Sequence, residues 1–433
     1  MTPKSAALWL LALGCGVADP LLVVDEDVVT VALASWSADG PGRTRIEVDN
    51  ADGAWLTTDW QEAGFGLSAP LLGLWPGTEY TARAVTEDGD HSADVGFTTG
   101  NLPAALPGYS VAGAPGWEGY LLTGLVSDPS AVVILDETGH VVWYHLGKKG
   151  LRALRTRLAP DGLGVRYASI EAVVDPEKSE LVTVDWGGAT VSSFPLPGFH
   201  HDFVDDGPDA IGIFNDVRPG RSGADVIGDA LFRIDGTTGD TSPIWSSWDT
   251  WDVPADSEMS AGSWTHANTL DPAEDGGWWV GMRNDSRIVE IGEDGSVGRQ
   301  LGGPESDWSF PEPADAPKFQ HGFQFEEGGV LIFDDRDPGS DEGSRVLDLA
   351  LDEEEFTATA RDIWVHDPPL PVYALGDVDR AADRSLLVTF SSAGVIDDVS
   401  PEGELRWELQ TELASGVSYV VRVAALPGIT RVR

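Results

Sequence analysis

The sequence has 433 residues and is 42% hydrophobic, which is enough for a folded chain of two or three domains and excludes a disordered one. Its formal net charge is −45, from 72 acidic and 27 basic residues, so nucleic acids and anionic membrane surfaces would repel it. Such a surface is typical of adaptation to salt or to an external medium, with a calcium-loaded surface as the alternative.

The N-terminus predicts an export signal over residues 1–18. Lys4 supplies a positive start, and the apolar run 6–13 is too short to span a bilayer. The run Ala12-Leu13-Gly14-Cys15 fits a lipobox, in which Cys15 would become the lipidated first residue, while residues 16–18 fit an ordinary cleavage site. Both interpretations place the protein outside the cytoplasm, in the periplasm or at the cell surface, and the first anchors it through Cys15. As the only cysteine, Cys15 also excludes an internal disulfide and a cysteine-based zinc site.

Residues 19–100 predict a small β-sandwich, because short alternating runs are separated by turn residues. Within them, the run 72–85 carries Leu74, Pro76, Thr78 and Tyr80 in a spacing that resembles the tyrosine corner of a fibronectin type III domain. The resemblance implies a spacer or docking module and no chemistry of its own.

Residues 101–115 are rich in Pro, Gly and Ala and are expected to be a linker. From residue 116 to 433 a loose repeat recurs, in which apolar residues, an Asp, a Gly turn and a closing Trp follow one another. Copies begin near Ile134, Val182, Arg233, Ile291, Leu351 and Val399. Strand repeats at about 40–50 residues are typical of a β-propeller. The sequence therefore predicts an all-β protein, a sandwich followed by a six-bladed propeller, with seven blades as the alternative.

Histidines in three sequence contexts are the best candidates for chemistry, and each context falls in a different expected blade. The contexts are Phe-His200-His201-Asp-Phe, Trp-Thr-His266-Ala-Asn268 and Phe-Gln-His321-Gly. Arg283 ends a predicted strand after the second context. Side chains from separate blades can converge at the axial funnel, where propellers bind ligands.

These motifs together resemble the arylsulfate sulfotransferase family, over most of residues 115–430. Family members move a sulfuryl group from a phenolic sulfate to a phenol through a sulfohistidine, without a nucleotide donor. The resemblance implies that His321 is the nucleophile and that His201, His266 and Arg283 bind the sulfate group. It implies no cofactor and no metal.

Two neighbouring residues complete the expected site. Asn268 matches the family residue beside the middle histidine and is assigned to substrate binding. His200 is assigned there too, or behind His201 as its partner, because strand alternation lets one of the two neighbours point inward and His201 aligns better. The residue types fit the chemistry, since a neutral imidazole is a competent nucleophile and Arg283 offers a fixed cationic fork to oxyanions.

The sequence departs from the family pattern at Gly322, where the family has Thr or Asp, and at Asp334-Asp335-Arg336, where it has Asp-Asn-Gly. These departures leave the four principal residues intact and leave the acceptor open.

The same histidines are compatible with roles other than catalysis. Each of them alone could be structural, and three histidines could bind zinc, although Arg283 favours an anion. His91, His140, His145 and His366 receive no role. The rival function is a non-catalytic surface propeller that binds a glycan or a protein. Convergence of the four principal residues on one sulfate-sized point would favour the enzyme.

Overall fold

The computed structural model describes residues 16–171, 177–220, 223–253, 263–337, 342–412 and 416–432. In these ranges the chain is all-β, with three 3₁₀ turns at Ser247–Asp249, Pro313–Asp315 and Ser391–Ala393. Cys15 and the apolar run before it lie outside the described residues. None of the described residues forms a helix long and apolar enough for a membrane span. The chain divides into two compact units, the first made of residues up to Leu102 and from Ala425 onward, the second of Pro103–Ala424.

The first unit contains two antiparallel sheets. One has the order β1-β2-β6, formed by β1 (Leu21–Val24), β2 (Ala32–Trp36) and β6 (Leu67–Leu71). The other has the order β34-β4-β3-β7-β8, with β5 also paired to β3; its strands are β3 (Arg43–Asn50), β4 (Gly53–Thr58), β5 (Gln61–Glu62), β7 (Glu79–Thr86), β8 (Val95–Thr98) and β34 (Ile429–Arg431). At the expected corner, the Trp75 N–H donates to the Tyr80 hydroxyl oxygen at 2.8 Å, which ties the strand to the loop before it.

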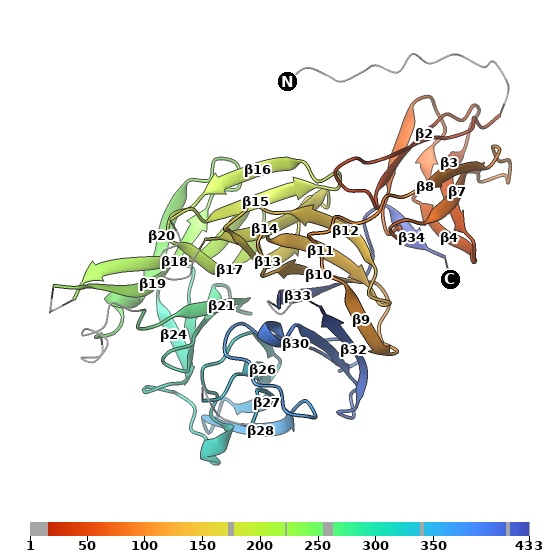
Figure 1. Ribbon diagram of the computed structural model, residues 1–433. Coiled ribbons are helices and arrows are strands. Elements are labelled where there is room, and N and C mark those ends of the chain that lie inside the picture. Colours follow the sequence, from red (N-terminus) through yellow and green to blue (C-terminus); the bar gives the residue numbers. More distant parts are fainter. Residues whose placement is uncertain are drawn as a thin grey trace. The chain divides into compact units, whose positions relative to one another are not determined.

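The second unit contains six antiparallel sheets, numbered from first to sixth in chain order (Figure 1). The first sheet is β10 (Tyr120–Leu125), β11 (Ala131–Asp136), β12 (Val141–Leu146) and β33 (Val417–Val423); the second is β13 (Arg152–Leu158), β14 (Gly164–Ile170), β15 (Glu180–Asp185) and β16 (Thr190–Pro195); the third is β17 (Phe199–Asp206), β18 (Asp209–Pro219), β19 (Asp225–Ile234) and β20 (Thr241–Ser246). The fourth is β21 (Ala267–Pro272), β22 (Trp278–Met282), β23 (Arg287–Ile291) and β24 (Val297–Gly302); the fifth is β25 (Phe323–Glu326), β26 (Gly329–Asp334), β27 (Arg345–Asp352) and β28 (Thr357–Trp364); the sixth is β29 (Asp377–Arg380), β30 (Leu386–Phe390), β31 (Val395–Val399), β32 (Leu405–Thr411) and β9 (Tyr109–Gly113).

The sheets of the second unit follow one another about a common centre, and the unit is propeller-like (Figure 1). Strands β10, β13, β17, β21, β25 and β29 each contact the next in that order, and β29 also contacts β33 of the first sheet. The hydrophobic core lies between neighbouring sheets, for example in the cluster of Ile213, Leu231, Val280 and Met282 between the third and fourth. Burial of apolar faces between sheets is what holds such repeats together.

The sequence repeats fall on the outer hairpin of each sheet. In the first sheet, Gly139 adopts φ 83° and its N–H donates to the Asp136 carbonyl at 3.0 Å, while the Asp136 carboxylate accepts from the N–H groups of Thr138 and His140. The closing tryptophans reach the neighbouring sheet, because the Trp143 Nε1–H donates to the Trp186 carbonyl and the Trp407 Nε1–H to the Glu137 carbonyl.

Two stretches differ from the expected domain boundaries. Residues 101–115 contain a strand, β9, which pairs with β32 at the edge of the sixth sheet. Residues from Ala425 onward belong to the first unit, where β34 pairs with β4. Both pairings join segments far apart in the sequence, and local composition carries no signal for such pairs.

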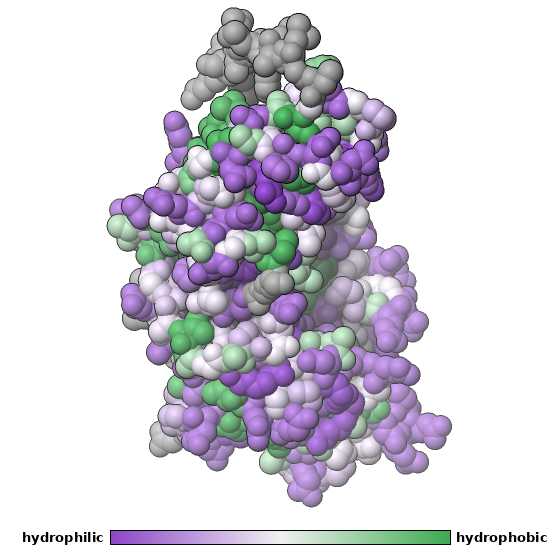
Figure 2. Space-filling model, turned by 90° about the vertical axis from the view of Figure 1, so that its right-hand side faces the viewer, coloured by the Kyte–Doolittle hydropathy of each residue, from purple (hydrophilic) through white to green (hydrophobic). Residues whose placement is uncertain are grey.

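The face of the molecule in Figure 2 is dominated by hydrophilic residues, and hydrophobic ones are scattered over it in small groups. This agrees with the strongly acidic composition.

Candidate functional site

Four residues predicted from the sequence line one cavity of about 560 Å³ in the second unit. They are His201, His266, Arg283 and His321. They come from β17, from the residue before β21, from the turn after β22 and from the segment before β25. The third, fourth and fifth sheets therefore each supply a side chain.

Bulges and left-handed backbone turn these side chains into the cavity. The pairing of β17 with β18 shifts register between His200 and Phe203, and β21 shifts against β22 between Ala267 and Thr269. His201 (φ 55°), His266 (φ 54°) and Leu375 (φ 61°) adopt the left-handed region, although none is a glycine. Such residues cost about 1–3 kcal/mol each, and they gather at functional sites when the surrounding fold enforces them.

His321 is held at both ring nitrogens. Nδ1 lies 2.7 Å from Asp335 Oδ2, and Nε2 accepts from the Leu375 N–H at 3.2 Å. Because a backbone N–H can only donate, Nε2 carries the lone pair and Nδ1 carries the proton. Burial raises the pKa of Asp335, and the contact with His321 acts against that rise. The ring is therefore held in the tautomer that presents a nucleophilic nitrogen at the end opposite Asp335.

His201 is supported from behind by a second histidine and a carboxylate. The Nδ1 atoms of His200 and His201 lie 2.7 Å apart, and His200 Nε2 lies 3.0 Å from Asp229 Oδ1. Asp229 Oδ2 also accepts from the Ala267 N–H at 2.7 Å and from the Thr265 hydroxyl. Burial acts to raise the pKa of Asp229, but His200, together with the hydrogen bonds from Thr265 and Ala267, outweighs it, and the pKa is lowered. The row Asp229–His200–His201 is thus anchored to the strand that presents His266.

Two of the histidines that face the cavity, His201 and His266, are uncharged without a ligand. Burial lowers the pKa of His201 well below its usual value, and the neighbouring histidines and Arg283 add to this effect. Burial also lowers the pKa of His266 to about 4, although Asp229 acts in the opposite direction. The two rings lie with centroids 4.9 Å apart. Proximity of like-charged groups inside a buried cavity disfavours protonation, so an incoming anion would meet N–H donors and Arg283.

Arg283 is the charged member of the group. Its Nη2 donates to the Tyr373 carbonyl at 3.2 Å and its Nη1 to Asn284 Oδ1 at 3.3 Å, while Nε lies 4.0 Å from Asp335 Oδ2. Burial lowers its pKa, which nevertheless stays far above neutrality for a guanidinium. The guanidinium is oriented by neutral oxygens more than by charge pairing, which leaves it able to attract an anion.

Asn268 lies behind the cavity and does not line it. Its Nδ2 donates to the Gln320 carbonyl at 2.8 Å, directly before His321, and its own carbonyl accepts from the Tyr419 hydroxyl at 2.7 Å. Gln320 in turn donates to the carbonyls of Met282 and Arg287. Asn268 therefore positions the segment that carries His321.

Gly322 is required by the space around it. A Cβ at this position would lie 2.0 Å from Asp377 Oδ1, so no side chain fits. The departure from the family pattern at Gly322 is matched by the close approach of Asp377.

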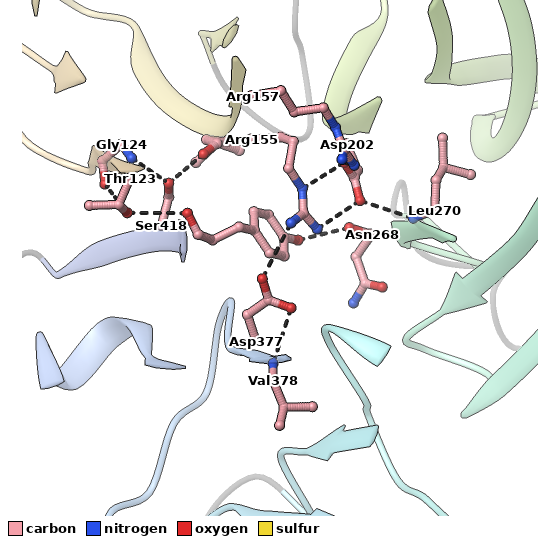
Figure 3. Close-up of polar contacts among 12 residues, drawn as sticks. Thr123, Gly124, Arg155, Arg157, Asp202, Asn268, Leu270, Asp377, Val378 and Ser418 are labelled. Atoms are coloured by element: carbon pink, nitrogen blue, oxygen red, sulfur yellow. Dashed lines mark hydrogen bonds and ion pairs between the residues drawn. The ribbon is translucent and has the colours of Figure 1, made fainter. Parts of the chain in front are cut away.

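An ion network lies at the centre of the second unit (Figure 3). The Arg155 guanidinium donates to both Asp202 oxygens at 2.8 and 2.9 Å and to Asp377 at 3.3 Å. These residues belong to the inner strands β13, β17 and β29. The guanidinium also lies 3.8 Å from the Tyr419 ring centroid. The network fixes Asp202, next to His201, and couples three sheets at the centre.

The rest of the cavity is suited to an aromatic ring. Apolar lining comes from Val126, Leu154, Leu375 and Val417, with Tyr373, Ser391 and Ser392 beside them. Arg152 adds a second, exposed guanidinium. Cavities of this size and mixture bind small organic molecules.

The three cavity histidines do not form a metal site in the described part of the chain. The only group there whose ligand atoms all lie within 4.8 Å of one another is elsewhere, at His366, Asp397 and Glu408. The zinc interpretation of His201, His266 and His321 therefore lacks geometric support.

Asn268 does not take the substrate contact expected for it, and His200 takes the alternative position expected for it, behind His201. His200 and Asn268 are buried behind the cavity wall, His200 because the bulge in β17 turns His201 forward and Asn268 because its amide is used by Gln320. Conversely, the supports Asp229, Asp335 and the Leu375 N–H were not assigned from the sequence. Asp335 stood out there only as a departure from the family pattern.

Comparison with known proteins identifies the family. The profile of the arylsulfotransferase (ASST) family matches residues 120–396. No curated protein matches the chain. Similar solved structures include a protein of unknown function from Bacteroides caccae (11% identity, 70% of this chain and 98% of that one, TM-score 0.43) and virginiamycin B lyase from Staphylococcus aureus (12%, 71% and 89%, TM-score 0.35). Likenesses this distant carry no functional argument. Since the profile spans more than half of the chain and includes all four cavity residues, the chain belongs to the arylsulfotransferase family.

Proposed function

We propose that this protein transfers a sulfuryl group from an aryl sulfate to a phenol through a sulfohistidine on His321, without a nucleotide sulfate donor. The observation that carries the proposal is the convergence of His201, His266, Arg283 and His321 on one cavity, with His321 held in the nucleophilic tautomer by Asp335. Family membership supports sulfuryl transfer as the reaction class.

In the first half-reaction, His321 Nε2 attacks sulfur. The bond between sulfur and the aryl oxygen breaks, and the phenolate leaves with the electron pair. The attack requires Nε2 to give up its contact with the Leu375 N–H, which then lies beside the transferring group as a donor to its oxygens. Arg283 and the N–H groups of His201 and His266 would stabilise the equatorial oxygens, where charge is spread in such loose transition states.

In the second half-reaction, the oxygen of an acceptor phenol attacks sulfur and the bond between Nε2 and sulfur breaks. The proton of the acceptor ends on the phenolate released earlier, so no net acid or base is needed. Asp335 accepts the Nδ1–H throughout and stabilises the positive charge that develops on the sulfonated ring. Asp335 thus acts as a positioning residue.

The rival function, a binding propeller without catalysis, lacks a specific observation in its favour. A binding site for a neutral glycan has no need of a partly buried guanidinium beside three histidines, or of a carboxylate fixing one ring's tautomer.

We also propose finer features of the architecture and location. The six sheets are interpreted as a six-bladed propeller, and the contact from Trp75 to Tyr80 supports a fibronectin type III-like first unit. We further propose export with a lipid on Cys15. Val17 bridges Ala38, and the Ala18 N–H donates to the Ser37 carbonyl at 2.9 Å. Cleavage before Cys15 would keep Val17 and Ala18 in the unit, whereas cleavage after Ala18 would remove both.

The test is a turnover assay on the protein beginning at residue 16. It is offered p-nitrophenyl sulfate with and without a second phenol, and the protein is then analysed for a covalent sulfuryl group by mass spectrometry. We expect nitrophenol release that rises with acceptor, and a modified peptide containing His321. Release without any dependence on acceptor would indicate a hydrolase, and no release with any phenol and no covalent adduct would favour the binding propeller.

A further inference from the structure

A second histidine-containing cluster lies between the fifth and sixth sheets. His366 follows β28, and Asp397 and Glu408 are directly paired across β31 and β32. One ligand atom from each of the three residues lies within 4.8 Å of the other two. His366 and Asp397 are buried, whereas the Glu408 side chain is 29% exposed. None of the three residues was assigned a role from the sequence.

The imidazole of His366 presents a bare nitrogen to two carboxylates. Its Nδ1 lies 2.8 Å from the Pro368 carbonyl, which can only accept, so Nδ1 carries a proton. The Nε2 of a neutral ring then has a lone pair pointing at oxygens, 3.2 Å from Glu408 Oε2 and 3.7 Å from Asp397 Oδ2. Lone pairs facing each other repel, so either a proton or a metal ion is expected between them. The proton would be carried by Nε2 or by Asp397, since burial raises the pKa of Asp397 to about 7.

Asp397 distinguishes these two cations. It is fully buried, and neither of its carboxylate oxygens has a hydrogen-bond partner. A proton on Nε2 would satisfy Glu408 at 3.2 Å but would leave Asp397, at 3.7 Å, without a hydrogen bond. Among the described residues, no Lys or Arg pairs with either carboxylate. A buried carboxylate with no partner is strongly disfavoured, and a bound cation would remove that cost.

The spacing and the ligand types favour a particular class of metal. Ligands at about 2.0–2.2 Å in a tetrahedral site lie about 3.3–3.6 Å from one another. The two distances from His366 Nε2 bracket this range. One neutral imidazole and two carboxylates carry two negative charges, which a divalent ion balances. Imidazole ligation is typical of zinc and its neighbours and disfavours calcium and magnesium. The hydrogen bond that fixes Nδ1 is the outer support that such ligands show.

We propose that His366, Asp397 and Glu408 bind one divalent transition-metal ion of the Zn²⁺ class, which fastens the end of the fifth sheet to the sixth. The ion enters from the side of Glu408, and a water completes its coordination. The site is separate from the cavity of His321, and it stands independently of the proposed reaction.

The test measures zinc binding and thermal unfolding on the chelator-treated protein, with ZnCl₂ as the titrant. We expect one zinc ion per chain by calorimetry and elemental analysis, and a Tm raised by about 4 °C at a hundredfold excess over Kd. Asp397→Asn and Glu408→Gln are nearly isosteric, and each should weaken binding at least ~100-fold. Because Glu408 is partly exposed, its variant tests the site even if Asp397→Asn does not fold.

His140→Ala is the matched control, since His140 is an exposed histidine beside Asp136, at 3.9 Å, outside the cluster. It should bind zinc like the wild type. Absence of binding by the wild type, or equal binding by both carboxylate variants, would overturn the proposal. The first result would mean that the cluster holds a proton instead of a metal ion. The second would mean that the zinc binds elsewhere on the acidic surface.

Discussion

The second unit contains two buried groups of histidines and charged residues with opposite compositions. The cavity gathers His201, His266 and His321 with Arg283, and its carboxylate, Asp335, lies behind His321. The cluster between the fifth and sixth sheets has one histidine and two carboxylates. The first composition favours an anion and the second a cation, although the same acidic chain supplies both. The residues in contact with each histidine therefore determine whether its site favours an anion or a cation, whereas the net charge of −45 describes the surface of the protein.

Replacing His321, the proposed nucleophile, should reduce activity most. We expect His321→Asn to reduce kcat at least about 10⁴-fold, because no other cavity residue presents a lone pair fixed by a carboxylate. Steady-state nitrophenol release and circular dichroism together measure activity and folding. His140→Ala should keep full activity; a His321 variant with wild-type turnover would move the nucleophile elsewhere.

Changing the carboxylate behind His321 should be nearly as severe. In Asp335→Asn an amide N–H can face Nδ1, which would move the ring proton to Nε2 and occupy the attacking lone pair. We expect about a 10³-fold loss in kcat, with KM little changed and an altered pH–rate profile. A loss confined to KM would instead make Asp335 a substrate contact.

Removing the cation tests whether the cavity is tuned for an anion. Arg283→Gln should lower kcat/KM about 10²–10³-fold, as expected for the loss of a charged donor to a transition state. Arg299→Gln, on the same sheet but paired with Glu290 at the surface, is the matched control. Equal small effects from both variants would contradict the anion-binding role.

The lowered pKa of His266 makes a prediction for stability. Its folded pKa of about 4 lies below the unfolded value near 6.5, so the unfolded chain binds more protons between these values. The contribution of His266 to the free energy of unfolding is therefore complete above pH 6.5. It is lost as the pH falls toward 4, by up to about 3 kcal/mol. Free energies of unfolding, measured with denaturant for the wild type and for His266→Gln across this pH range, should converge at low pH. Parallel curves would show that His266 is not held neutral.

The smallest effect is expected at the cavity rim. Arg152 is exposed, so Arg152→Gln should raise KM for an aryl sulfate about five- to tenfold and leave kcat unchanged. The difference between the two proteins should shrink at high salt, because exposed charges are screened. A salt-independent difference would indicate a packing role.

Local sequence signals predicted much of this fold. The repeats beginning at Ile134, Arg233, Leu351 and Val399 lie on outer hairpins. In the first two, an Asp, a Gly with positive φ and a closing Trp specify the hairpin within about a dozen residues. In the Leu351 copy Phe356 takes the positive φ, and in the Val399 copy Ser400 replaces the Asp. The strand β9 and the tail from Ala425 onward escaped prediction, since their partners lie hundreds of residues away.

The residues of the site can likewise be divided into those that local sequence predicted and those that it did not. Motif order placed His201, His266, Arg283 and His321, and the structure brings all four to one cavity. Strand alternation favoured His201 over His200 as the inward-facing neighbour, as the structure has it, but it could not place Asn268, which lies where β21 shifts register against β22. His366, Asp397 and Glu408 carry no motif, and their closeness is a product of the assembled sheets.

The first sheet joins strands from opposite ends of its unit, since Leu122 on β10 pairs with Val421 on β33. During synthesis, the first three strands of this sheet therefore emerge early, whereas the fourth, β33, emerges only after nearly the whole unit has been made. Contacts so distant in sequence slow folding and leave strand edges open in the meantime. The same late strand brings Tyr419, whose hydroxyl bonds the Asn268 carbonyl behind His321. Synthesis thus reaches Tyr419, which supports the segment before His321, only after most of the second unit has been made, and a chain that stops before β33 would lack this support.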